Sequence, residues 1–215
     1  MKTIVQIVLW IVCIGLGYLI YQSVTGPIEF KKVKEERFSK VISTLKDIRD
    51  SQVAYRTVNG KYANDFKSLV AFVDTGKYTI TQQRDSSYME FDKVYGIDML
   101  KEITIIDTLG FVAVKDSIFR DSDRYKTMMN VPYAEGEKFS IKADVVDKGG
   151  YSAPVFEVKV SKDVILADQP KDLRDRENAQ ISVEEVNGPE IKVGSLTDVS
   201  TNGNWPPIYD KKGNK

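Results

Sequence analysis

The 215-residue chain contains no histidine and one cysteine, Cys13. Without histidine, nucleophile pairs of the Ser-His-Asp and Cys-His types are excluded, and so is every ordinary zinc site. The chain beyond Cys13 cannot be cross-linked by disulfides, so it must fold on an apolar core alone. Catalysis would have to rest on carboxylates, lysine or tyrosine, and no particular pair stands out among the many acidic residues. We therefore expect a protein that is not an enzyme.

An excess of charge of either sign is also missing. Lysine plus arginine and aspartate plus glutamate number 31 each, which gives a formal net charge of zero. Nucleic-acid-binding domains usually carry a basic patch or a clearly positive total charge. We expect no nucleic-acid partner.

Charged residues are absent between Lys2 and Glu29, and Ile4–Ile20 is an almost purely apolar run. Its length is near the minimum for a helix that crosses a bilayer. A cleavable signal peptide should be followed by a small-x-small site, which Tyr21–Gly26 does not provide. A lipoprotein signal is rejected because Trp10-Ile-Val precedes Cys13 where a small residue is needed. We favour an uncleaved anchor over residues 1–24, surrounded by membrane lipid, and cleavage stays as the alternative.

The orientation of this anchor follows from two opposing signals. Lys31, Lys32, Lys34 and Arg37 lie after the apolar run, and the positive-inside rule then favours a cytoplasmic body. The very short amino-terminal tail behaves instead like that of a signal peptide. We predict a single-pass protein of the bacterial inner membrane with its soluble domain in the periplasm, and a cytoplasmic domain is the alternative.

A long amphipathic helix is predicted next, over residues 25–58. Thr25-Gly-Pro27 is a helix-start or kink signal, and apolar residues then recur in steps of three and four up to Tyr55. Asn59-Gly60 is the expected end of the helix. The apolar face either packs on the protein's own sheet or, near the membrane, contacts other copies or partners. The candidate contact residues are Ile28, Phe30 and Val33.

Residues 59–215 are predicted to form a β-rich domain with a mobile tail, so the fold class is α+β, with an antiparallel sheet packed on the long helix. A short helix is expected after Asn64 or Asp65, which can cap it. Alternation over Lys138–Val146 and Val155–Val160 predicts a hairpin that turns at Lys148-Gly-Gly150. Other expectations are short strands at Tyr78–Thr81, Thr104–Ile106, Phe111–Val114, Val164–Leu166 and Glu190–Val193, a helical turn at Met99–Ile103, and an exposed loop or short surface helix at Asp168–Asn178.

Residues 37–76 resemble the type IV pilin and type II secretion major pseudopilin family. The resemblance is carried by Leu45-Lys-Asp-Ile-Arg-Asp-Ser-Gln-Val-Ala-Tyr55, Asn59-Gly-Lys-Tyr-Ala63 and Phe66-Lys-Ser-Leu69. Near the other end, Asn202-Gly-Asn-Trp205 is similar to the close of major pseudopilins. The family's Gly-Phe-Thr-Leu-Ile-Glu processing site is not found before the apolar run. The resemblance implies a pilin-like domain, while the missing glutamate removes the family's filament-registering contact.

In that family the final loop often binds calcium. Asp198, Ser200 and Asn202 offer oxygen atoms at alternate positions, as in the first half of a calcium loop. Tyr209 stands where an acidic residue usually closes such a loop, and Asp210 comes one step later. Calcium through Asp198, Ser200, Asn202 and Asp210 is the metal hypothesis, and an ordinary Asn-Gly turn without any cofactor is the favoured alternative.

From these features we expect a non-enzymatic interaction subunit of a bacterial envelope complex of the secretion or surface-motility type. Its partners would be other membrane or envelope proteins. A filament-forming pilin, with self-association through the apolar helix, and a membrane anchor for a cytoplasmic partner are the alternatives.

Overall fold

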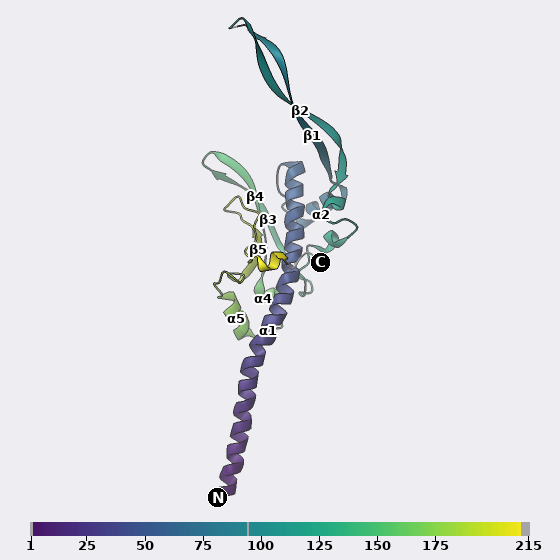
Figure 1. Cartoon of the computed structure of the whole chain (residues 1–215). Helices are drawn as coiled ribbons and strands as arrows, with labels where there is room; N and C mark the ends of the chain where they lie inside the picture. Colours follow the sequence, from purple (N-terminus) through teal and green to yellow (C-terminus); the bar gives the residue numbers. More distant parts are fainter. Residues whose placement is uncertain (1, 94, 212–215) are drawn as a thin grey trace.

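The computed structural model describes residues 2–93 and 95–211 and shows an elongated α+β molecule built on one long helix (Figure 1). Helix α1 spans Lys2–Asn59, about 85 Å at the usual rise per residue. It runs without interruption through the predicted boundary at residues 24 and 25 and through Pro27. It ends as predicted, because Gly60 adopts a positive φ of 73° that other residues rarely tolerate.

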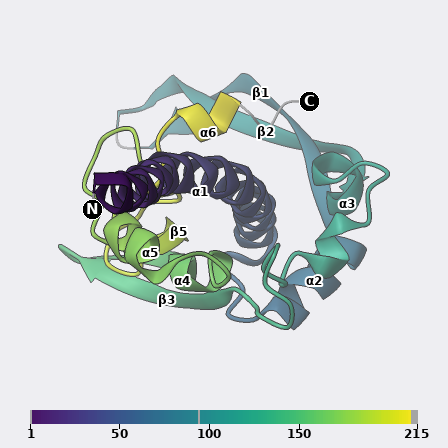
Figure 2. The same ribbon diagram turned by 90° about the horizontal axis from the view of Figure 1, so that it is seen from below.

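The second half of α1 forms the centre of the body of the molecule. Its apolar stripe, from Phe38 through Ile48, is fully buried, and the other elements of the body are arranged around it when the molecule is viewed from below (Figure 2). The spacing of three and four residues that predicted this stripe is therefore confirmed.

A three-stranded antiparallel sheet packs on this stripe. It consists of β3 (Ser140–Lys148), β4 (Tyr151–Ser161) and β5 (Glu190–Gly194), in the order β3-β4-β5. The predicted hairpin and last strand are confirmed, with Gly149 and Gly150 both at positive φ in the turn. Phe156, Val158 and Val160 of the central strand are buried in the core.

Short helices complete the body. Asp65 caps α2 (Phe66–Thr75) as predicted, since its carboxylate accepts a hydrogen bond from the Ser68 N–H. The expected strand at Val164–Leu166 is wrong, because the Ser161 hydroxyl caps a helical turn, α4 (Lys162–Ile165), at that point. The charged segment after it forms α5 (Lys171–Asn178). The remaining elements are α3 (Val114–Ile118), the 3-10 helix η1 (Arg124–Thr127) and α6 (Ile208–Lys211). Part of the expected mobile tail, residues 212–215, lies outside the described residues.

Strands β1 (Lys77–Asp92) and β2 (Ile97–Ala113) form a two-stranded antiparallel ribbon that projects from the end of the body opposite the amino terminus (Figure 1). We call this ribbon the distal arm. The predicted helical turn at Met99–Ile103 is wrong, since this segment pairs along Ser86–Glu90. Its residues favour a helix locally, and cross-strand pairing overrides that preference. At about 3.3 Å per residue the arm is roughly 50 Å long.

Candidate interaction sites

The apolar half of α1 is the first candidate site. Every side chain described between Thr3 and Val24 is exposed, and α1 is the one helix among the described residues that is long and apolar enough to cross a membrane. Of the predicted contact residues just beyond this part, Ile28 is exposed, Val33 is half-buried, and Phe30 is buried in the core of the same chain. Ile28 is therefore the best placed of the three to touch a partner or lipid.

A buried ionic cluster lies where the body begins on α1. The Glu177 carboxylate of α5 accepts hydrogen bonds from Lys34 Nζ at 3.0 Å and from Lys162 Nζ at 2.9 Å. Lys34 also donates to Glu185 at 2.8 Å, and Lys162 donates to the carbonyl of Val186. The side chains of Lys34, Lys162 and Glu177 are all nearly inaccessible to solvent.

Burial disfavours the charged form of both lysines, but the net shift of the pKa differs between them. Burial lowers the pKa of Lys162 below the usual lysine value, and the bond to Glu177 only partly offsets this effect. Burial would also lower the pKa of Lys34, but the hydrogen bonds that its ammonium donates to Glu185 and Glu177 outweigh burial and raise that pKa. The cluster ties α1 to α4, α5 and the following loop. Lys162 Nζ donates to three acceptors and Lys34 Nζ to two. We therefore interpret the cluster as a set of contacts that stabilises the packing of these elements on α1.

The segment that carries the pilin resemblance forms a clamp between α1 and the turn that follows it. The Gln52 side chain is buried and both accepts from the Ala63 N–H, at 2.9 Å, and donates to the Ala63 carbonyl, at 2.8 Å. The Tyr62 ring packs on Phe156 of the sheet, with 4.6 Å between ring centroids. These residues hold the helix end against the sheet.

Residues of the calcium hypothesis form an ion pair and hydrogen bonds within this chain. Asp210 forms an ion pair with Lys46 at 2.9 Å and accepts a hydrogen bond from the Trp205 indole at 3.2 Å. The Ser200 hydroxyl accepts from the Asn202 N–H within the loop. Among the described residues, no three Asp, Glu, His or Cys side chains gather closely enough to hold a metal ion. Calcium binding stays a prediction with no geometric support from Asp210.

The distal arm exposes many large apolar side chains on both of its faces. Directly paired residues of antiparallel strands point to the same side, so the register assigns every residue to a face. One face, which we call the acidic face, carries odd-numbered residues of 81–91 and even-numbered residues of 98–108. Its large apolar side chains are Met89, Phe91, Leu100 and Ile106, and its charged ones are Asp85, Asp98 and Glu102.

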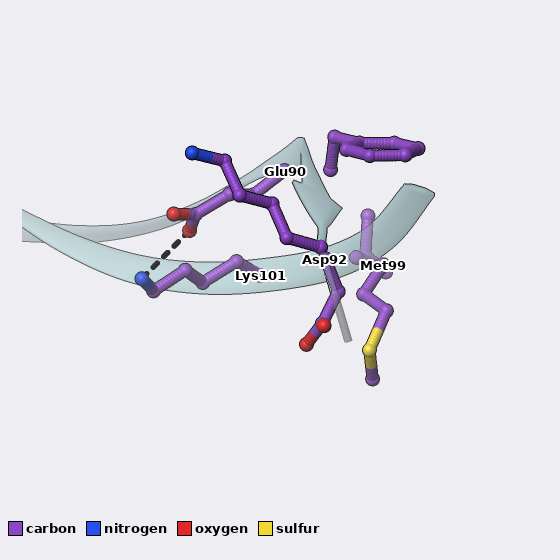
Figure 3. Close-up of a pocket in the computed structure, with 7 residues that line it drawn as sticks. Glu90, Asp92, Met99 and Lys101 are labelled. Atoms are coloured by element: carbon purple, nitrogen blue, oxygen red, sulfur yellow. Dashed lines mark hydrogen bonds and ion pairs between the residues drawn. The ribbon is translucent and has the colours of Figure 1, made fainter. Parts of the chain in front are cut away.

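The opposite side, which we call the ion-paired face, carries even-numbered residues of 82–92 and odd-numbered residues of 97–107. Lys101 pairs with Glu90 across the strands at 2.7 Å, and Arg84 pairs with Asp107 at 3.4 Å. Figure 3 shows Glu90 and Lys101 pointing toward each other near the tip, with Met99 and Asp92 beyond them. These residues line part of a shallow hollow of about 420 Å³ in the coiled ribbon.

Sequence reasoning found the apolar helix but missed the arm and the ionic cluster. The arm's apolar residues were visible as short β-prone runs, yet the polar stretch Gln82–Ser87 hid the continuity of β1. No local signal marks Lys162 or Glu177 as buried. Glu177 lies in a densely charged stretch, and a lysine between two apolar runs, such as Lys162, is typical of an exposed turn.

No protein-family model, no curated protein and no solved structure matches this chain.

Proposed function

We propose that this protein is a membrane-anchored, non-enzymatic interaction subunit that presents the distal arm to a partner protein far from the bilayer. The observation that carries the proposal is the placement of two uncovered apolar regions at opposite ends of one rod (Figure 1). The apolar half of α1 fits a bilayer. The exposed apolar side chains of the arm must be buried by something other than this bilayer, since α1 and the body hold the arm away from it.

The arm is the part that calls for a partner. A two-stranded ribbon without further strands is at best marginally stable in water, and its two open edges invite pairing with another chain. Among its side chains, Met89, Leu100, Ile106 and Phe111 are each more than 60% exposed. A partner that covers this apolar surface would remove it from water and order the ribbon.

The setting we propose is a bacterial envelope complex of the secretion or surface-motility type, with the body in the periplasm and a pilin-like arrangement of helix and sheet. The support is the resemblance over residues 37–76 together with a long amino-terminal helix packed on an antiparallel sheet. A filament-forming subunit is the second candidate, favoured by the uncovered apolar half of α1, through which copies would pack.

The test is affinity purification of the full chain in mild detergent, with the composition of the product determined by mass spectrometry and its shape by electron microscopy. We expect an assembly with other membrane or envelope proteins in fixed ratio. A homopolymer of this chain alone would overturn the proposal in favour of the filament subunit, and a bare monomer would overturn both.

A further inference from the structure

The two faces of the distal arm are similar in apolar content and different in charge. On the acidic face, the segments 81–91 and 98–108 place three carboxylates, those of Asp85, Asp98 and Glu102, and no basic side chain. On the ion-paired face, Arg84 and Lys101 pair with two of the three carboxylates present. The formal charge of these segments is therefore −3 on the acidic face and −1 on the ion-paired face.

The acidic face is also the more open of the two. Its apolar side chains Met89, Phe91, Leu100 and Ile106 are 58–66% exposed, while Tyr88, Ile97, Met99 and Ile103 of the ion-paired face are 40–57% exposed. Apolar groups and uncompensated carboxylates are thus interleaved on the most accessible side of the ribbon.

We propose that the acidic face of the distal arm is a docking surface for a basic, amphipathic segment of a partner protein. Such a segment would place apolar side chains on Met89, Phe91 and Leu100 and lysine or arginine near Asp98 and Glu102. The inference rests on the proposed function, because it specifies the partner that the arm takes. An amphipathic helix with basic residues beside its apolar stripe has this chemistry.

The negative charge of the acidic face argues against two other partners, which are a second copy of this chain and an anionic lipid bilayer. A second copy could place its own acidic face, with a formal charge of −3, on the acidic face of the first. It could instead place its ion-paired face there, which has a net charge of −1. Both arrangements bring like charges together, which is unfavourable. A bilayer surface rich in anionic lipid is repelled for the same reason.

The test uses the full chain in nanodiscs of phosphatidylcholine and two synthetic amphipathic helical peptides, one of leucine and lysine and one of leucine and glutamate. Binding is measured by fluorescence anisotropy of the labelled peptide, with empty nanodiscs as the blank. We expect the leucine–lysine peptide to bind and the leucine–glutamate peptide to bind at least roughly tenfold more weakly, as a few exposed charge pairs would produce.

Adjacent serines supply a matched control. Ser87 lies on the acidic face opposite Glu102, and Ser86 lies on the ion-paired face opposite Ile103; both are exposed. Ser87→Lys should weaken binding of the leucine–lysine peptide several-fold, while Ser86→Lys, with the same change of charge, should alter it less than about twofold. Leu100→Ser and Met99→Ser form a second pair for the apolar contribution, with the larger loss expected for Leu100→Ser.

Equal effects of the two lysine variants, equal binding of the two peptides, or no binding at all would overturn the inference. So would concentration-dependent self-association that Ser87→Lys strengthens. These outcomes are distinguishable from failure of the proposed function: if the acidic face is wrong but the arm still docks a partner, the purified native assembly survives Ser87→Lys and is lost when residues 81–108 are removed.

Discussion

At the scale of single residues, the body is held together by polar contacts that cross long stretches of sequence. Lys34 and Glu177 are 143 positions apart, and both are buried in one ionic cluster. Hydrophobic spacing predicts the stripe Phe38–Ile48 well, because apolar residues repeat locally. It cannot reveal a buried ion pair, since each partner alone resembles an ordinary surface residue.

Glu177→Gln tests the importance of this cluster. The substitution leaves Lys162 buried without its charged partner, and removing one member of a buried ion pair costs roughly 3–5 kcal/mol. Thermal unfolding followed by circular dichroism in detergent should show this loss in the free energy of unfolding. Asp175→Asn, at an exposed position of the same helix, should change it by less than about 0.5 kcal/mol. Equal stability of the two variants would contradict the account.

The ion pair between Arg37 and Asp168 predicts a dependence on pH. The two hydrogen bonds from the guanidinium hold the pKa of Asp168 at about 2, below the ordinary value of 3.8. A carboxylate whose pKa is lowered by folding contributes stability above pH 3.8, and this contribution is lost as the pH falls through 2. Asp168→Asn should therefore lower the melting temperature at pH 6, and the gap from the unsubstituted protein should be much smaller at pH 2 and should vanish at lower pH. A gap that is unchanged at pH 2 would show that the pair is not the cause.

At the scale of elements, the segments that pack one face on the core are predicted well from the sequence, and the segment that exposes both faces is not. Helix α2, the β3–β4 hairpin and β5 were predicted because caps, glycine turns and one-sided alternation agree with the final structure. The distal arm has apolar residues on both faces, so strict alternation is lost, and Met99–Ile103 then favours a helical turn. The long pairing of β1 with β2 depends on contacts between strands and is not encoded in either strand alone.

Hydrogen exchange should separate the arm from the body. Amides of β1 and β2 between residues 81 and 108 should exchange at least roughly a hundredfold faster than those of β4, because a solvated ribbon opens locally while β4 is a central strand on the core. Mass-spectrometric exchange on the full chain in nanodiscs measures both regions at once. Comparable protection of the two regions in the isolated protein would argue that the arm needs no partner.

At the scale of the whole molecule, the arrangement is a rod with a membrane-compatible helix at one end and an uncovered ribbon at the other. The sequence predicts the first end directly from its apolar run. It predicts the class, α+β, and the order of most elements. The sequence does not predict how far apart the two ends lie. The arm begins directly after α2, and only the three-dimensional structure shows that it projects away from the amino terminus (Figure 1).

The side of the membrane on which this rod stands is open to a direct test. We expect alkaline phosphatase fused after Lys215 to be active, which requires export to the periplasm, and a cytoplasmic reporter at the same position to be inactive. The reverse pattern would place the body in the cytoplasm and make the protein an anchor for a cytoplasmic partner.

Whether the arm recruits the partner is decided by two affinity purifications from cells, one with the full chain and one with residues 81–108 replaced by a short Asn-Gly turn. The core of the body lies outside the replaced segment, so this variant should insert and fold as before. We expect the full chain to purify with partner proteins in fixed ratio and the variant to reach the membrane without them. Recovery of the same assembly with both chains would show that the arm does not bind the partner.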